Sequence, residues 1–478
     1  MTQSNSFLTP DSFGSNGAGS SGGHTPGYTG RFLVTFEPGA SEQAASVLRN
    51  QAGIEAVSSR EVGVKATSEN TVFEEIGVAV VSALPDEHGA LLAAASDANV
   101  PVRHVERERI VWASMFENPQ QAATNGTSRG LAKPQAFAQP SAPTASSGPA
   151  PALAVPASAN LNTEFLRGYF AAIQGLLAGA FPALADSGTR VEVEAATAAA
   201  TYGLNITGVV NSTRSGQGIR VAVLDTGFDL NHPDFAGRTV VTQSFVTGEA
   251  VQDGHGHGTH CIGTSCGPRS VPGNPRYGIA FNAAIYAGKV LSNAGSGGDG
   301  GILAGINWAV QNQCQVISMS LGSPVSVGEP FSQAYQNAAA AAEKKGTLIV
   351  CAGGNDSHRP GQIAPVGHPA NCPTILAVAA IDSTLAVASF SDGSVNPNGG
   401  EVNVAGPGVN VFSSWPMPLR YRTISGTSMA TPHVAGIAAL FAEATGLRGL
   451  ALANEMLRHA RRLFPVSDFG WGLVQAPV

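Results

Sequence analysis

Charged residues are scarce in this 478-residue chain, at 12% of the sequence, and aromatic residues make up only 6%. The formal net charge is −7 and no cluster of lysine or arginine occurs, which argues against a nucleic-acid-binding surface. No uninterrupted apolar run reaches the length of a transmembrane helix, so we expect no membrane-spanning segment.

Cysteine is also rare. The chain has five cysteines, an odd set that does not indicate a disulfide framework. Residues 1–30 are rich in Ser, Gly and Thr and contain neither a basic start nor an apolar stretch, unlike a secretory signal peptide. We therefore expect a disordered tail over 1–30, and a protein that is cytoplasmic or exported by a route without a cleaved leader.

Glycine is abundant, with 58 residues, and together with many Ala and Val it suits a large, closely packed α/β core. The length predicts two ordered units joined by a linker. Residues 31–113 show a strand–helix–strand–strand–helix–strand pattern, typical of a split βαβ unit. The expected elements are a strand at 32–36, a helix at 41–51, strand structure within 71–82, a helix at 85–96 and a strand at 102–111.

Residues 114–190 form an Ala/Pro-rich linker in this interpretation. Within it, apolar residues spaced as on one helix face predict an amphipathic helix at 162–181. Packing on the following domain is its simplest role, and an inhibitory or partner-docking helix is the alternative. The remaining residues, 191–478, form the larger domain.

A serine near the C-terminal end has the surroundings of a nucleophile. The segment 425–433 reads Ser-Gly-Thr-Ser-Met-Ala-Thr-Pro-His, and the apolar run after it predicts a buried helix that begins near Ser428. Gly426 allows tight backbone curvature there. A helix start offers unpaired N–H groups and partial positive charge, which suit a developing oxyanion.

Three upstream segments supply partners for this serine. A β-branched strand at 219–224 ends in Asp225, and the carboxyl ends of parallel strands face the ligand crevice. A glycine-rich block at 253–260 carries three histidines before a helix-like run. A buried strand at 348–352 precedes Asn355. Asp, His and Ser follow one another in an order that is known for a serine-protease triad.

These blocks together resemble the subtilisin family of serine proteases. The resemblance implies that Asp225 orients an imidazole, that His257 acts as general base and then acid, and that Ser428 attacks the carbonyl. His257 is selected over His255 and His260 because the family's catalytic histidine opens the His-Gly-Thr-His block. His433 is expected to be structural.

The resemblance extends to the substrate cleft. Asn355 and the backbone N–H of Ser428 would form the oxyanion hole. The strand that ends in 320–322 would pair with the substrate backbone. One wall of the pocket for the residue before the scissile bond would be Ser320, Leu321 and Gly322, and the other Ala352, Gly353 and Gly354. Small residues there imply broad cleavage after large hydrophobic residues, and Asp356 at the rim would add tolerance for basic side chains.

The implied fold is α/β: a subtilisin-like three-layer domain with a mostly parallel sheet, preceded by a small α+β, ferredoxin-like propeptide domain. The unit at 31–113 is similar in pattern to that propeptide, which acts as a folding template and an intramolecular inhibitor; an unrelated α+β domain is the alternative. A tail that passes beyond the 112–115 segment would thread the cleft, and cleavage would release the inhibitor.

The chemistry of this family requires no cofactor. Asp234 matches a carboxylate that binds structural calcium in many relatives, but the loop 267–277, where the other ligands would lie, has no acidic residue. Cys261 resembles a buried thiol of proteinase-K-like members, and a packing cysteine is the alternative. It has no catalytic role in either interpretation. The distance between Cys351 and Cys372 cannot be read from the sequence.

The expected activity is therefore a serine endopeptidase made as a self-processing zymogen, with protein or peptide substrates. Two alternatives stay open. One is a dedicated processing protease for one precursor or partner, and the other is a non-catalytic binding protein on a peptidase fold.

Overall fold

The computed structural model describes residues 27–37, 39–40, 43–62, 70–113, 115–117 and 199–478. The chain divides into two units, one made of residues 1–124 and 198–478 and the other of residues 125–197. The second unit lies outside the described residues, and so do the helix expected at 162–181, most of the linker and most of the expected N-terminal tail.

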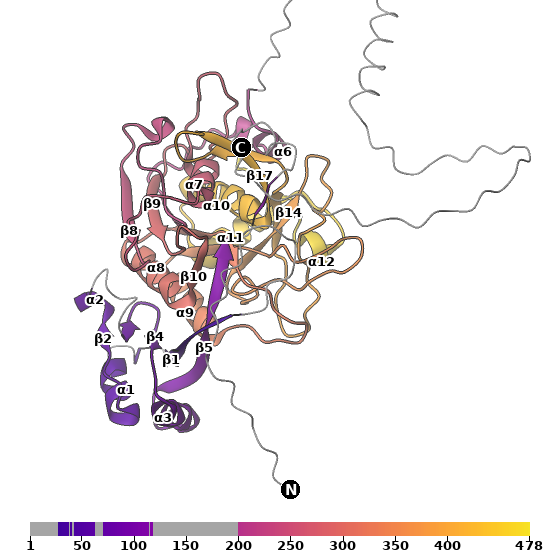
Figure 1. Cartoon of the computed structure of the whole chain (residues 1–478). Coiled ribbons are helices and arrows are strands. Elements are labelled where there is room, and N and C mark those ends of the chain that lie inside the picture. The colour runs from indigo at the N-terminus through magenta and orange to yellow at the C-terminus, as the bar shows by residue number, and fades with distance from the viewer. Residues whose placement is uncertain (1–26, 38, 41–42, 63–69, 114, 118–198) are drawn as a thin grey trace, which may run out of the picture. The chain divides into compact units, whose positions relative to one another are not determined.

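A sheet of seven parallel strands forms the centre of the larger domain, in the order β15-β14-β13-β11-β7-β9-β8 (Figure 1). Its inner strands read as nearly continuous apolar runs because both faces are buried. The strands are β7 (Arg220–Asp225), β8 (Val240–Ser244), β9 (Ala284–Lys289), β11 (Val316–Met319), β13 (Leu348–Ala352), β14 (Leu376–Ile381) and β15 (Val404–Pro407).

Helices cover this sheet and give the domain three layers (Figure 1). The helices α7 and α10 pack against each other and against the sheet, and α8 and α9 form a second pair. The fold is thus the α/β class that the sequence predicts. The helices are α6 (Tyr202–Ile206), α7 (His257–Cys266), α8 (Asp299–Gln311), α9 (Gln333–Lys344), α10 (Thr427–Thr445), α11 (Gly449–Arg458) and α12 (Val466–Phe469).

The N-terminal unit has a sheet and a hydrophobic core of its own, in which Val34, Phe36, Leu48 and Leu91 are buried. Its strands lie in the order β5-β1-β4-β3-β2, antiparallel except for the pair β2–β3. The elements are β1 (Tyr28–Phe36), α1 (Ala44–Ala52), β2 (Val57–Ser58), α2 (Ser59–Val62), β3 (Thr71–Phe73), β4 (Val78–Val81), α3 (Pro85–Ser96) and β5 (Val102–Ala113).

The last strand of this unit extends past its own sheet onto the larger domain. The end of β5 pairs antiparallel with β10 (Ser296–Gly298) on one side and with β12 (Leu321–Gly322) on the other. The next strand, β6 (Phe116–Glu117), pairs antiparallel with β17 (Tyr421–Ser425), which itself pairs with β16 (Val411–Ser414). The segment from β5 to β6 therefore pairs in succession with three strands of the larger domain, β10, β12 and β17.

Two carboxylates of β5 contact the starts of α8 and α9. Glu108 is 3% exposed and accepts the N–H of Gly300 at 2.7 Å. Glu106 accepts the N–H of Ala334 at 2.8 Å and the hydroxyl of Ser332 at 2.7 Å. Negative charge at a helix N-terminus is stabilising because the first N–H groups of a helix have no partner within it.

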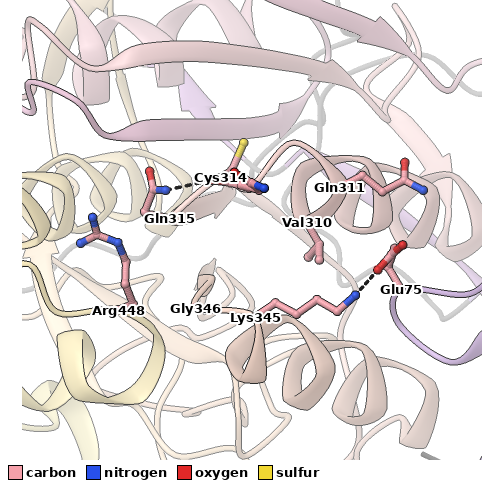
Figure 2. A pocket seen from close by; sticks show the side chains of 9 residues that line it. Glu75, Val310, Gln311, Cys314, Gln315, Lys345, Gly346 and Arg448 are labelled. Carbon is pink, nitrogen blue, oxygen red and sulfur yellow. Dashed lines mark hydrogen bonds and ion pairs between the residues drawn. The ribbon is translucent and has the colours of Figure 1, made fainter. Parts of the chain in front are cut away.

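A cavity of about 580 Å³ lies where the N-terminal unit meets the larger domain, and Figure 2 shows the ion pair between Glu75 and Lys345 at its edge. Gln315 and Gly346 line it, directly before β11 and close before β13. The cavity is therefore at the amino ends of the parallel strands. Ligand crevices in such sheets form at the carboxyl ends, so we place the site elsewhere.

Among the described residues, no single helix has the length and hydropathy of a membrane span. The helices α10 and α11 pass such a test only jointly, as a pair bent by 103°.

Candidate active site

Asp225 and His257, 32 residues apart in the chain, meet at the carboxyl end of the sheet. Asp225 is the last residue of β7 and His257 the first of α7, and Nδ1 of His257 lies 2.7 Å from Oδ1 of Asp225. Both are buried in the described chain, at 1% and 0% exposure. A carboxylate that accepts from Nδ1 fixes the imidazole tautomer and leaves Nε2 as the proton acceptor.

Two glycines let the histidine helix approach the strand so closely. Gly256, before the helix, has φ of 108°, and a Cβ there would lie 2.3 Å from the Trp415 ring. A Cβ on Gly258 would lie 2.3 Å from the carbonyl oxygen of Gly227. Neither position has room for a side chain, and the close approach of Gly258 to Gly227, two residues after Asp225, helps to bring His257 within reach of that carboxylate.

Asp253 holds the histidine block in place, a role that the sequence analysis missed. Its Oδ1 accepts the N–H groups of His255 and Gly256 and the hydroxyl of Thr226, and its Oδ2 accepts the N–H and hydroxyl of Thr259. The available signal was a carboxylate just ahead of a helix start, the position where it satisfies unpaired N–H groups.

Ser428 is the second residue of α10, as the sequence predicts, and its side chain is buried in the described chain. Its hydroxyl donates to the carbonyl of Ser320 at 3.1 Å, and Nε2 of His257 has no hydrogen-bond partner among the described residues. The expected serine-to-imidazole bond is thus not formed in this state. Catalytic hydrogen bonds often tighten only in the reacting complex.

The thiol of Cys261 contacts both the imidazole of His257 and the backbone of Ser428. Its Sγ lies 3.9 Å from Nδ1 of His257 and 3.6 Å from the carbonyl oxygen of Ser428. Ligand atoms of Asp225, His257 and Cys261 all lie within 4.8 Å of one another. Burial raises the pKa of this thiol well above its usual value, so the sulfur stays protonated at neutral pH.

Asn355 is oriented by the helix that carries Ser428. Its Oδ1 accepts the N–H of Thr427 at 2.8 Å and the hydroxyl of the same residue at 2.9 Å. Because a backbone N–H can only donate, this end of the amide must be the oxygen, and the NH₂ group is directed elsewhere. An oriented amide donor beside a helix start is the arrangement that an oxyanion requires.

Two other histidines near the site, His260 and His433, bond to backbone carbonyls. Burial lowers the pKa of His260 to about 3, and its Nε2 donates to the carbonyl of Val411. Burial also lowers the pKa of His433 to about 4, and its Nδ1 donates to the carbonyl of Met429. Both rings are therefore neutral near pH 7. Desolvation lowers the pKa of His255 as well.

The residues predicted to line the substrate pocket lie on adjacent strands. Met319 is the last residue of β11 and Leu321–Gly322 form β12, and Ser320 between them also donates its hydroxyl to the carbonyl of Ser428 at 2.8 Å. Ala352 ends the neighbouring strand β13. The other predicted wall residues, Gly353 and Gly354, follow it directly.

The surroundings of Asp234 do not fit a calcium ion. Its carboxylate accepts the hydroxyl of Tyr277 at 2.6 Å, a guanidinium N–H of Arg420 at 2.8 Å and the hydroxyl of Tyr421 at 3.1 Å. Calcium requires six or more oxygen ligands, whereas these groups present hydrogens to the carboxylate. Arg420 also supplies the positive charge that a cation would otherwise provide.

All five cysteines are free and buried, so Cys351 and Cys372 form no disulfide. Both thiols lie in the apolar core, and the same burial raises the pKa of each.

The larger domain is similar in sequence to known proteins. The model of the subtilase family matches residues 216–472. The chain is 40% identical to subtilisin DY of Bacillus licheniformis over 261 residues, which is 54% of this chain and 89% of that protein. It is 39% identical to a cuticle-degrading protease of Metarhizium anisopliae over 238 residues, 48% of this chain and 55% of that one. It is also 41% identical to subtilisin E of Bacillus subtilis over 228 residues, 47% of this chain and 56% of that one.

Proposed function

This chain belongs to the subtilase family and is a serine-type endopeptidase, and from that premise we propose that Asp225, His257 and Ser428 are its catalytic triad. The 2.7 Å contact between Asp225 and His257, at the carboxyl end of the sheet beside the start of the serine helix, is the observation that carries the proposal.

The chemical steps follow from these positions. Nε2 of His257 takes the proton of the Ser428 hydroxyl as Oγ attacks the substrate carbonyl, and then gives it to the departing amine, which leaves an acyl-enzyme. Water repeats the sequence and releases the acid and the free hydroxyl. Asp225 stabilises the imidazolium at each stage. No cofactor takes part in peptide hydrolysis by subtilases.

The oxyanion is held by the amide of Asn355 and by the backbone N–H of Ser428 at the helix start. The bonds from Thr427 to Oδ1 of Asn355 support this role, because they fix the donor end of the amide before the reaction begins. Donors that are already in place need no reorganisation as charge develops.

The N-terminal unit acts as a propeptide of the same chain. Its strand β5 occupies the position of a substrate between β10 and β12, and the N–H of Ala113 donates to the carbonyl of Gly295 at 2.8 Å. The helix-start bonds of Glu106 and Glu108 hold it there. A bound strand of this kind would block the cleft by β-augmentation until it leaves.

The register indicates which bond is cut. Ala113 pairs with Leu321 on one side of the serine, and Phe116 pairs with Ser425 on the other. The bond between Ser114, which lies outside the described residues, and Met115 is midway between these anchors, so we propose it as the self-processing site. The buried Val111 would then occupy the fourth position before that bond.

The substrate preference is inferred from the size of the residues that line the pocket. The small residues of the wall at 352–354 support a roomy pocket and broad cleavage with a preference for hydrophobic side chains. A serine before the proposed self-processing bond is compatible with a bond cut within one molecule, where a high effective concentration makes side-chain fit less important.

Mass determination of the purified full chain tests this function. We expect a fragment whose N-terminus is Met115, formed at a rate independent of protein concentration, because the bond is presented within the molecule. A chain that stays intact and inactive on casein would contradict the proposal, and so would a first cut in a remote loop.

A further inference from the structure

One arginine of the propeptide strand is held at two points by the larger domain. The backbone N–H of Arg109 donates to Oδ2 of Asp299 at 2.8 Å, and its guanidinium forms an ion pair with Glu329. The two side chains of the ion pair are only 15% and 24% exposed. Arg109 is the sixth residue on the amino side of the proposed Ser114–Met115 bond.

The acidic partner is positioned without help from the propeptide. Oε2 of Glu329 accepts the N–H of Ser326 at 2.8 Å, which leaves Oε1 for the guanidinium. The side chain of Asn396 bonds to the carbonyl of Glu329 and the N–H of Gly328, and Asn398 bonds to the carbonyl of Gly328. These bonds all lie within the larger domain, so they remain when the N-terminal unit departs.

Groups on the larger domain and on the propeptide strand both affect the pKa of this carboxylate. Burial raises the pKa of Glu329, but the N–H of Ser326 and the guanidinium of Arg109 outweigh it and hold the pKa below its usual value. In the zymogen the carboxylate is thus ionised at neutral pH, and the N–H of Ser326, which favours the charged form, stays beside it when Arg109 leaves.

Asp299 adds a contact that any residue can make. It is fully buried, and its second oxygen lies 2.9 Å from Nε2 of His368, which fixes the carboxylate. Because it accepts a main-chain N–H, it sets the register of an extended strand and not its sequence. Side-chain selection at this position is left to Glu329.

We propose that Glu329 forms a distal subsite of the mature enzyme, which selects an arginine or lysine six residues before the scissile bond of an extended substrate. The inference rests on the proposed function, because it requires that substrates follow the path of β5. In the zymogen the subsite is filled by Arg109, and release of the N-terminal unit opens it.

Cleavage of matched peptides by the mature enzyme tests the subsite. The parent peptide carries residues 107–117 of this chain, and a control of the same composition and charge has the residues at 109 and 110 interchanged. We expect kcat/KM to be roughly 10-fold higher for the parent peptide, the low end of the range for one hydrogen bond between charged groups. The preference should weaken at high salt.

The variant Glu329→Gln keeps an oxygen for the N–H of Ser326 but loses the charge. It should cleave the two peptides equally, and a short peptide of residues 111–116 at the parental rate. Equal cleavage of both long peptides by the parent enzyme would overturn the subsite and leave the protease function intact. Absence of cleavage of every peptide would overturn the proposed function itself.

Discussion

Ser428→Ala is expected to abolish both peptide hydrolysis and self-processing, with a loss in kcat of roughly 10⁶-fold, the size of loss that the similar enzyme subtilisin shows. The other hydroxyl at the start of α10, on Thr427, is engaged with Oδ1 of Asn355, which leaves Ser428 as the nucleophile for the unpartnered Nε2 of His257 in the described chain. The measurement is kcat on a fluorogenic peptide, with the intact mass of the chain as a second readout.

The matched control for this variant is Ser244→Ala, at the last residue of the edge strand β8. It removes the same hydroxyl two strands away from Asp225 in the sheet, where that hydroxyl bonds the backbone of Val246, and kcat should stay at the parental value. Retained hydrolysis by a folded Ser428→Ala protein would show that another residue is the nucleophile.

The second large effect is expected from Asn355→Leu, which keeps the approximate shape of the side chain and removes its amide. Loss of one oxyanion donor costs about 10²–10³ in kcat, a range known for this position in subtilisin. The effect should appear in kcat and not in KM, because the donor matters most when the oxyanion has formed.

The variant Thr427→Val tests how much the orientation of the Asn355 amide contributes, apart from the amide itself. This change removes the hydroxyl that bonds to Oδ1 of Asn355 but keeps the backbone N–H bond to the same atom. We expect a smaller loss in kcat than for Asn355→Leu. Equal losses, or a change confined to KM, would contradict the assignment of Asn355 to the oxyanion hole.

Local patterns predicted the elements that carry the site. The β-branched run before Asp225 is β7, and the apolar run after Ser428 is a helix that begins at Thr427. The helix expected at 85–96 is α3, with the same bounds. These features depend on neighbours in the sequence, where strand alternation, glycine and apolar spacing are informative.

Local sequence patterns could not predict side-chain contacts between segments that are far apart in the chain. Arg420 lies 186 residues from Asp234, and the sequence near either residue does not indicate that the guanidinium forms an ion pair with that carboxylate. The same is true of Arg109 and Glu329, which are 220 residues apart. The hydroxyl of Ser428 donates to Ser320 and not to His257, which only the packing of two strands and a helix can determine.

The central claim is that Asp225, His257 and Ser428 form a catalytic triad. Covalent labelling of the processed protein by a serine-directed phosphonate tests it most directly, because the serine reacts rapidly only when the imidazole activates it. Peptide mass mapping should find a single adduct on Ser428 in the parent, and the rate of labelling should fall at least a hundredfold, roughly, in His257→Ala, as loss of the general base predicts. An adduct on a different residue, or labelling of Ser428 that proceeds at the same rate without the imidazole, would contradict the account.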